Sequence, residues 1–450
     1  MAGKFSWLGS YGLGFVRAFL LVLCVASVAD AAEGTDLRPD ILFVLIDSLK
    51  ASHLGCYGYG RNTTPNLDRF AATEGVRFET VIAGGSWTQP AVMTLFSSWT
   101  ADRHLRVEPR KPHNPDIVTL AQALKSAGYQ TVGITANAMT NRRFGYGKGF
   151  DVWDDYSATL SPDADEKQFG TGYANGAALT RMGLNRLKRR DSAKPLFLFL
   201  FYMDPHWDFL PPAPYDRMFS PDGVPPPKGI WRQKASEVPS AMRQRTVDAY
   251  DGEIAFCDHV LSNLFAEVKS MPRGKDTVIV VVGDHGEGFW EHGFASHGND
   301  LHEEEIHVPL IIRPAVGDGS YVPGAVVRGQ VGAIDIAPTV LDLVGVKSPS
   351  VWQGTSLKPL LKGGVSDGHP VVTETRISPR GGWMRAVRTA GKSSPVRRLN
   401  NLRKFTTLLP TEPRRTIWRL RAGIRRTMSR RCCPCSSLFS KKGSDWLCEN

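Results

Sequence analysis

A hydroxyl side chain and the signals that begin a helix come together in one segment, Ser86-Trp-Thr-Gln-Pro-Ala-Val-Met-Thr-Leu-Phe-Ser-Ser98. Pro90 is tolerated in the first turn of a helix, and Thr88 just before it is a good capping residue. We therefore expect the Thr88 hydroxyl at a helix N-terminus, where free backbone N–H groups and the helix dipole attract an anion. Taken alone, the pattern favours an ordinary helix cap.

Polar side chains also follow several short apolar runs, which read as buried strands. Five runs have this character: Ile41–Ile46, Thr131–Thr135, Leu196–Phe201, Thr277–Val282 and Val308–Ile312. The residues that follow the first four are Asp47, then Asn137, then Asp204 with His206, then Asp284 with His285. Because ligands in open α/β sheets bind outside the carboxyl ends of the strands, we expect these groups at one edge of a sheet.

Amphipathic stretches separate the apolar runs, as crossover helices would. Asp116–Ala127 reads as a helix closed by Gly128, and Val247–Lys269 reads as a longer helix. Pro211–Pro227 is rich in proline and reads as a surface loop near the strand ends. The pattern predicts an α/β fold with a central, mostly parallel sheet flanked by helices.

Several phrases of the chain resemble the sulfatase family of the alkaline phosphatase superfamily. In order they are Ile46-Asp-Ser-Leu-Lys50, His53-Leu-Gly-Cys-Tyr-Gly-Tyr59, Asn62-Thr-Thr-Pro-Asn-Leu67, Gly75-Val-Arg-Phe78, Tyr250-Asp-Gly-Glu-Ile254, Gly283-Asp-His-Gly-Glu287, Glu291-His-Gly293, Glu303-Glu-Glu-Ile-His-Val-Pro-Leu-Ile311 and Asp335-Ile-Ala-Pro-Thr339. The resemblance implies an alkaline-phosphatase-like sandwich and a catalytic domain over residues 39–390. It also implies an incomplete or atypical C-terminal subdomain, because the family completes that subdomain where the composition of this chain changes.

The resemblance further implies one divalent metal ion, held by Asp47, Asp284, His285 and the Thr88 oxygen. Carboxylates and an imidazole suit a hard-to-borderline cation, which would activate a hydroxyl and neutralise an anionic ester. Each residue alone also has a structural reading. The aspartates would cap or turn the chain after a strand, and His285 would be a satisfied structural histidine.

Three departures from the family pattern define the subtype that we expect. Typical sulfatases carry C-x-P-S-R, or Ser in place of Cys, whose first residue is oxidised to formylglycine. Here Thr88 holds that place and Val92 replaces the supporting Arg. Ser48 stands where a second Asp is usual, and His285 stands where calcium-dependent members have Asn. Fewer oxygen ligands and one nitrogen favour Mn²⁺ or Zn²⁺, with Ca²⁺ or Mg²⁺ as the alternatives.

Two histidines and one asparagine are predicted to face the substrate. His206 resembles the strand-end histidine of the family that contacts the ester oxygens, and His297 resembles the residue that protonates the leaving group. Asn137 is a candidate for orienting the substrate. For each histidine the alternative is a structural role in a loop, and His292 and His302 are expected to be structural or rim residues.

These predictions describe a metal-dependent hydrolase that cleaves sulfate or phosphate esters with Thr88 as nucleophile and His297 as acid. Thr-nucleophile relatives include phosphoglycerol and phosphoethanolamine transferases, so transfer to an alcohol is an alternative. A catalytically silent binding protein on the same scaffold is a second alternative, favoured by Val92 and Ser48. The expected partner is an anionic ester on a small molecule, a glycan or a lipid headgroup.

The formal net charge of +11 is concentrated at the C-terminus. Residues 381–450 hold 17 Lys and Arg against three acids, which leaves 38 basic against 41 acidic residues in the rest of the chain. The body is therefore near neutral, and nucleic acid is not an expected partner. Residues 391–450 form a basic tail, either native or produced by a shifted reading frame, to which no fold is assigned.

The N-terminus predicts export to the periplasm or the cell exterior. Lys4 and Arg17 precede an apolar stretch from Ala18 to Ala29, so residues 1–31 read as a cleaved signal peptide. An uncleaved anchor is the alternative, and with the basic tail it leaves contact with a membrane surface open. Cys56 and Cys257 are the cysteines of the body, so no disulfide framework is expected.

Two further motifs are weak signals. Gly145-Tyr-Gly-Lys-Gly149 lacks the spacing and the Ser or Thr of a phosphate loop, and we expect a turn. The cysteines at Cys432, Cys433, Cys435 and Cys448 have zinc-ligand chemistry but no accompanying fold pattern.

Overall fold

A sheet of nine strands runs through the centre of the chain, in the order β11-β10-β2-β9-β6-β1-β5-β3-β4. The computed structural model describes residues 38–106, 113–155, 175–377, 382–389 and 397–398. The strands are β1 (Ile41–Ile46), β2 (Val76–Ile82), β3 (Gln130–Thr135), β4 (Val152–Asp154), β5 (Leu196–Tyr202), β6 (Val278–Gly283), β9 (His307–Arg313), β10 (Val326–Gly332) and β11 (Gly364–Val365). All are parallel except β9, which opposes both β2 and β6.

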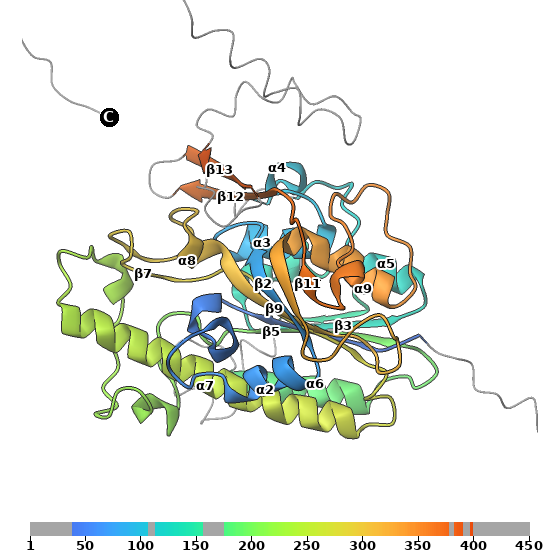
Figure 1. The fold of residues 1–450 in the computed structure, drawn as a ribbon, viewed down its shortest axis with the longest axis horizontal. Helices are drawn as coiled ribbons and strands as arrows, with labels where there is room; N and C mark the ends of the chain where they lie inside the picture. The colour runs from blue at the N-terminus through green and yellow to red at the C-terminus, as the bar shows by residue number, and fades with distance from the viewer. Residues whose placement is uncertain (1–37, 107–112, 156–174, 378–381, 390–396, 399–450) are drawn as a thin grey trace, which may run out of the picture. The chain divides into compact units, whose positions relative to one another are not determined.

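Helices cover both faces of this sheet (Figure 1). They are α2 (Pro65–Thr73), α3 (Thr88–Ser97), α4 (Ala101–His104), α5 (Leu120–Ser126), α6 (Gly176–Lys188), α7 (Ser240–Ser270), α8 (Glu303–Ile306) and α9 (Ile336–Leu343). Short 3-10 turns are η2 (Ala51–His53), η3 (Gly55–Tyr57), η4 (Ala138–Thr140), η5 (Arg142–Phe144), η7 (Tyr215–Arg217), η8 (Ile230–Arg232), η9 (Ala333–Asp335) and η10 (Lys358–Leu360).

The alternation of side chains along each strand creates two apolar cores. In β1, Phe43 and Leu45 pack in one core with residues of α3, α5 and α9, whereas Leu42 and Val44 pack in the other with α2, α6 and α7. Successive residues of a strand point to opposite faces, so a strand buried on both sides is apolar throughout. This explains why the central strands appear in the sequence as continuous apolar runs.

Two smaller sheets lie outside the central one. The hairpin of β7 (Gly288–Phe289) and β8 (Ala295–Ser296) belongs to the excursion between β6 and β9. An antiparallel sheet of β12 (Val371–Ile377), β13 (Gly382–Arg388) and β14 (Arg397–Arg398) follows the central sheet in the chain. The expected C-terminal subdomain is therefore represented by a short sheet in the described residues.

The predicted elements agree closely with the structure. The five apolar runs are β1, β3, β5, β6 and β9, and the α/β fold with a mostly parallel sheet is confirmed. The helix predicted from Asp116 begins at Leu120 instead, because Thr119 and Gln122 form a capping box at that point. The helix predicted from Val247 begins at Ser240, since its first turns are largely exposed and carry no apolar stripe.

Other predictions have simpler outcomes. Gly145–Gly149 is a turn, as expected, and Pro211–Pro227 is a loop that contains only η7. Cys56 and Cys257 are free. The predicted signal peptide and nearly all of the basic tail, with its four cysteines, lie outside the described residues and stay predictions. Among the helices that are described, none combines the length and apolar character of a membrane span.

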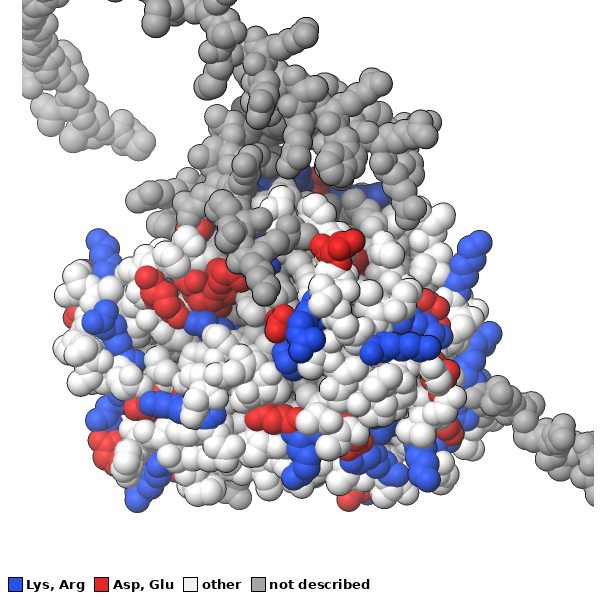
Figure 2. Space-filling model, viewed as in Figure 1, with Lys and Arg blue, Asp and Glu red and all other residues white. Residues whose placement is uncertain are grey.

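Charged side chains of both signs are interspersed over the face of the molecule shown in Figure 2. Acidic groups gather near α8, whose first turn carries Glu303 and Glu304. On that face the described residues form no continuous basic patch. This distribution agrees with the near-neutral body expected from the sequence.

We predict that Phe199→Ala lowers the free energy of unfolding by about 3–5 kcal/mol. The Phe199 ring is fully buried and contacts the rings of Phe43, Phe96 and Trp153, so its loss leaves a cavity between the sheet and α3. Urea unfolding followed by far-UV circular dichroism measures the change. Val365→Ala, at a side chain that is 84% exposed, is the control and should change the value by less than about 0.5 kcal/mol.

Candidate active site

Four neighbouring strands bring their carboxyl ends to one edge of the central sheet. The strands β6, β1, β5 and β3 are adjacent in that order and parallel. The residues that follow them are Asp284, Asp47, His206 and Asn137. The sheet order therefore gathers groups that are up to 237 residues apart in the chain, as the sequence pattern predicted.

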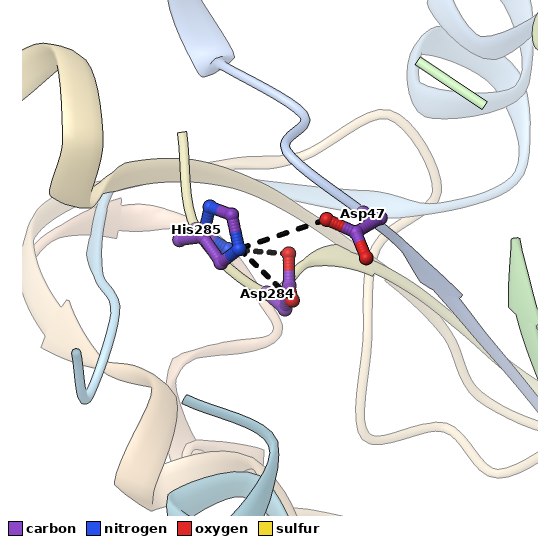
Figure 3. Close-up of side chains that lie close together, drawn as sticks. All are labelled: Asp47, Asp284 and His285. Carbon is purple, nitrogen blue, oxygen red and sulfur yellow. Dashed lines mark hydrogen bonds and ion pairs between the residues drawn. The ribbon is translucent and has the colours of Figure 1, made fainter. Parts of the chain in front are cut away.

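Asp47, Asp284 and His285 form a compact cluster at this edge (Figure 3). Each offers a ligand atom, and these atoms lie within 4.8 Å of one another. His285 Nε2 lies 3.6 Å from Asp47 Oδ1 and 3.4 Å from Asp284 Oδ2. All three side chains are fully buried. In the described residues this is the one group of acidic, His or Cys side chains with metal-binding geometry.

Backbone contacts fix the orientation of the cluster. His285 Nδ1 lies 2.9 Å from the carbonyl oxygen of Gly286, so the ring donates through Nδ1 and keeps a lone pair on Nε2. Asp284 Oδ1 accepts from the N–H groups of Ser48 at 3.1 Å and of His285 at 2.7 Å. These bonds leave Nε2 and Asp284 Oδ2 directed at each other.

The electrostatics of the cluster favour a cation. Burial, and then the charge of nearby Asp47, raise the pKa of Asp284 well above its ordinary value. Burial, and then His297, lower the pKa of His285 to about 3, which keeps the imidazole neutral. No hydrogen-bond donor of the described residues reaches Asp284 Oδ2. Two carboxylates, a neutral imidazole and an unsatisfied buried oxygen fit a divalent cation.

The Thr88 hydroxyl lies beside this cluster. Thr88 Oγ1 is 3.5 Å from His285 Nε2 and accepts from Asn137 Nδ2 at 3.3 Å. The sequence predicted Thr88 as the cap residue, but α3 begins at Thr88 itself, and Trp87 occupies the cap position without a side-chain cap bond. The hydroxyl thus faces the cluster and not the helix backbone, although it does lie at the helix N-terminus.

Asn137 connects Thr88 with the cluster. Its Nδ2 group donates to Asp47 Oδ2 as well as to Thr88, while its Oδ1 accepts from the N–H of Met139 at 2.7 Å. The side chain is buried and its orientation is fixed from both ends. Asn137 therefore orients groups of the site, and its predicted contact with substrate stays a prediction.

His297 approaches the cluster from the loop after β8. Its ring centroid is 4.3 Å from that of His285, and its Nδ1 lies 3.1 Å from Glu287 Oε2 and 3.5 Å from Ser48 Oγ. Burial, and then the neighbouring His206, lower the pKa of His297 to about 3. Burial raises the pKa of Glu287 to about 8. A protonated carboxyl beside a neutral imidazole is the state that burial favours here.

His206 lies next to His297, with ring centroids 5.1 Å apart. Its Nδ1 is 2.7 Å from the carbonyl oxygen of Trp207, and Trp207 in turn stacks on Trp231 at 4.3 Å. The loop that carries His206 is held from α7, where Glu253 Oε1 accepts from the N–H of Leu210 at 2.8 Å. The predicted substrate histidines are thus brought together at the same edge as the cluster.

Three supporting residues were missed by the sequence analysis. Glu287 and Glu253 stood within quoted family phrases without an assigned role, and Ser48 was noted only as a replacement for Asp. Ser48 Oγ donates to Asp47 Oδ1 at 3.0 Å, and its backbone has φ 55°. A buried acid within a family phrase was a usable signal for Glu287. Nothing in the sequence marked the left-handed backbone of Ser48.

The remaining histidines of this region lie away from the cluster. His292 and His302 stack on each other with centroids 3.5 Å apart, and His292 Nδ1 lies 2.5 Å from Glu304 Oε1. Neither contributes to the group with metal-binding geometry.

Comparison with known proteins agrees with this geometry. The family model described as Sulfatase matches residues 39–346. N-acetylglucosamine-6-O-sulfatase of Bacteroides thetaiotaomicron is 25% identical over 429 residues, covering 76% of this chain and 74% of that protein. Arylsulfatase of Clostridium perfringens is 25% identical over 390 residues, covering 72% of this chain and 79% of that protein.

Solved structures show the same fold. BT4656, in complex with its substrate D-glucosamine-2-N,6-O-disulfate, superposes with a TM-score of 0.63 at 21% identity, covering 81% of this chain and 91% of that chain. Phosphonate monoester hydrolase of Silicibacter pomeroyi gives a TM-score of 0.61 at 22% identity, covering 80% and 88%. The alkaline-phosphatase-like fold and the family that the motifs predicted are confirmed.

We predict that Asp284→Asn weakens the binding of Mn²⁺ or Zn²⁺ by more than about 100-fold, beyond the 10–100-fold effect of losing an outer partner. The reason is that the substitution removes one of two carboxylates that share the buried cluster. Isothermal titration of metal into chelator-treated protein measures the affinity. Asp222→Asn, at an exposed carboxylate paired with Arg245, is the matched control and should bind metal like the wild type.

Proposed function

The chain belongs to the sulfatase family, and we propose that it cleaves sulfate or phosphate esters with the Thr88 hydroxyl as nucleophile. The observation that carries the proposal is the position of Thr88 Oγ1, at the N-terminus of α3 and 3.5 Å from His285 Nε2. Its place in the chain is that of the formylglycine precursor in typical sulfatases. Thr is not converted by that route, so the unmodified hydroxyl would react.

Asp47, Asp284, His285 and the Thr88 oxygen would hold the metal ion. Sulfatase-family enzymes use a divalent metal, and a donor set with one nitrogen and few oxygens favours Mn²⁺ or Zn²⁺ over Ca²⁺ or Mg²⁺. When bound, the ion supplies the positive charge that lowers the pKa of the Thr88 hydroxyl and neutralises the anionic ester. The orphaned Asp284 Oδ2 supports this assignment.

In the proposed reaction Thr88 Oγ1, having lost its proton to water, attacks the sulfur or phosphorus in line with the leaving oxygen. The new bond joins Thr88 to the sulfuryl or phosphoryl group, and the bond to the alcohol breaks. Free N–H groups at the start of α3, with His206, would stabilise the equatorial oxygens. Water then attacks the adduct and regenerates the threonine.

His297 would supply the proton that the leaving alkoxide needs. Its Nδ1 is engaged by Glu287, which leaves Nε2 free to donate to the leaving oxygen. As Nε2 gives up its proton, Nδ1 can take the proton of the buried Glu287 carboxyl, so the ring ends neutral. Asn137 would hold Thr88 Oγ1 in place by donating to it.

The printed activities of the relatives define the substrates to test. One relative is named an N-acetylglucosamine-6-O-sulfatase, and one structural neighbour is a phosphonate monoester hydrolase. We therefore propose an anionic ester, with sulfated amino sugars and phosphorus esters as the two leading classes. Membrane contact and export stay predictions, because they depend on residues outside the described part of the chain.

We predict that Thr88→Ala lowers kcat by roughly 10⁴-fold or more, as the loss of a covalent nucleophile does. Metal affinity should fall only modestly, because three ligands remain. Initial rates with 4-nitrophenyl sulfate, 4-nitrophenyl phosphate and phenyl phosphonate esters, each with Mn²⁺ or Zn²⁺, measure the effect. Thr88→Ser keeps a hydroxyl and is the control. Turnover by the alanine variant near the wild-type rate would remove Thr88 from the mechanism.

His297→Ala is expected to slow alkyl esters by about 10²–10⁴-fold while affecting 4-nitrophenyl esters much less. A good leaving group departs without a proton, whereas an alkoxide needs one. Comparing kcat for the two ester types in both proteins measures the difference. Glu287→Gln, which can still bond to Nδ1 but cannot transfer a proton, should show a smaller loss with the same dependence. Equal losses for both ester types would exclude a role as acid.

A further inference from the structure

The C-terminal strand β12 lies against the segment that leads into α3. The N–H of Glu374 donates to the carbonyl oxygen of Gly84 at 3.2 Å, and Gly85 pairs with Glu374 as an isolated parallel bridge. A Cβ on Gly85 would lie 2.8 Å from the carbonyl oxygen of Glu374 and 2.7 Å from Pro90 Cγ. Only glycine permits this approach, three residues before Thr88.

The same strand also reaches the loop that carries His297. Thr375 Oγ1 donates to the carbonyl oxygen of Gly298 at 3.4 Å. Gly298 has φ +77°, and a Cβ there would lie 3.3 Å from Trp87 Cβ. Neighbouring residues of β12 therefore contact the backbone beside Thr88 and the backbone beside His297.

A buried ion pair holds β12 in this position. Glu374 is fully buried, and its Oε2 accepts from the N–H of Asp102 at 2.7 Å. Arg385 of β13 pairs with Glu374 Oε1 and, at 2.6 Å, with Asp102 Oδ2. Asp102 belongs to α4, which directly follows α3. The three charged groups thus join both strands of the hairpin to the end of the helix that begins at Thr88.

The apolar contacts of the hairpin do not explain why this pair is buried. Val371, Met384 and Ala386 already pack with Ile82, Leu301 and Ile306 in a small core of their own. A buried ion pair is weak evidence for stability, because desolvation offsets most of its attraction. What it adds is a fixed direction, since each charged group must keep its partners.

We infer that Glu374 is a positioning residue, which through Arg385 and Asp102 fixes the backbone beside Thr88 and His297. The functional unit then extends past residue 346, where the match to the family model ends, to include β12 and β13. This inference rests on the proposed roles of Thr88 and His297 for its catalytic consequence, and on the contacts alone for its structural one.

Glu374→Ala tests the inference with two readouts. Hydrogen exchange followed by mass spectrometry should show at least about tenfold faster exchange in peptides that cover residues 84–97 and 294–300, with exchange in β1 and β5 unchanged. In the same protein kcat should fall by about 10–100-fold, the scale of losing an outer partner, with KM and metal affinity nearly unchanged. Glu374→Gln keeps the acceptor for Asp102 and should recover part of both effects.

Glu303→Gln is the matched control, because Glu303 pairs with Arg388 of the same hairpin at 2.6 Å but contacts neither active-site segment. Unchanged exchange and kcat in Glu374→Ala would overturn the inference. If Glu374→Ala does not fold, Arg385→Lys gives the same test, and wild-type exchange and kcat in that variant would overturn it as well. Faster exchange in a chain whose wild type turns over no ester would support the positioning role and defeat the proposed function instead.

Discussion

Two buried carboxylates that share one small space are the constraint on which the site depends. Asp47 and Asp284 both lie within 3.6 Å of His285 Nε2, with no exposed surface. Like charges in such surroundings raise each other's energy, and the raised pKa of Asp284 expresses that repulsion. A protein keeps such an arrangement when a cation resolves it. The neutral imidazole and the unsatisfied Asp284 Oδ2 complete the environment that a divalent ion needs.

The architecture of the sheet brings these groups together. Parallel strands β6, β1, β5 and β3 end at one edge, and β2 delivers the segment that leads to Thr88 to the same edge. The antiparallel strand β9 lies between β2 and β6, and the excursion before it carries His297 back over the strand ends. The reversal of one strand thus places the acid and the nucleophile around one cluster.

Outer contacts then set the orientation of the groups that react. Asn137 ties Thr88 to Asp47, Glu287 engages one nitrogen of His297, and Gly286 engages one nitrogen of His285. Such contacts decide which nitrogen of a histidine is free and which lone pair of a hydroxyl is used. A threonine suits this setting, because the methyl group restricts its χ1 rotation and the neighbouring donors fix its hydroxyl.

The sequence alone determined much of the fold and the members of the site. Continuous apolar runs identified β1, β3, β5, β6 and β9, because strands buried on both faces must be apolar throughout. The polar residues after those runs, with the order of the family phrases, identified Asp47, Asp284 and His285. The strand β2 was missed, although Val76, Phe78, Val81 and Ile82 are its buried positions, because Arg77 and Glu79 interrupt the run.

Only the tertiary structure decided how these residues meet. Whether Thr88 caps its helix or faces a cluster depends on where β6 and α3 lie in space, and local sequence carries no such information. The contacts of Glu287 with His297 and of Glu374 with Gly84 join segments between 10 and 290 residues apart. Short-range patterns report local conformation and burial, whereas contacts of this kind follow from sheet order and loop paths, which the whole chain sets together.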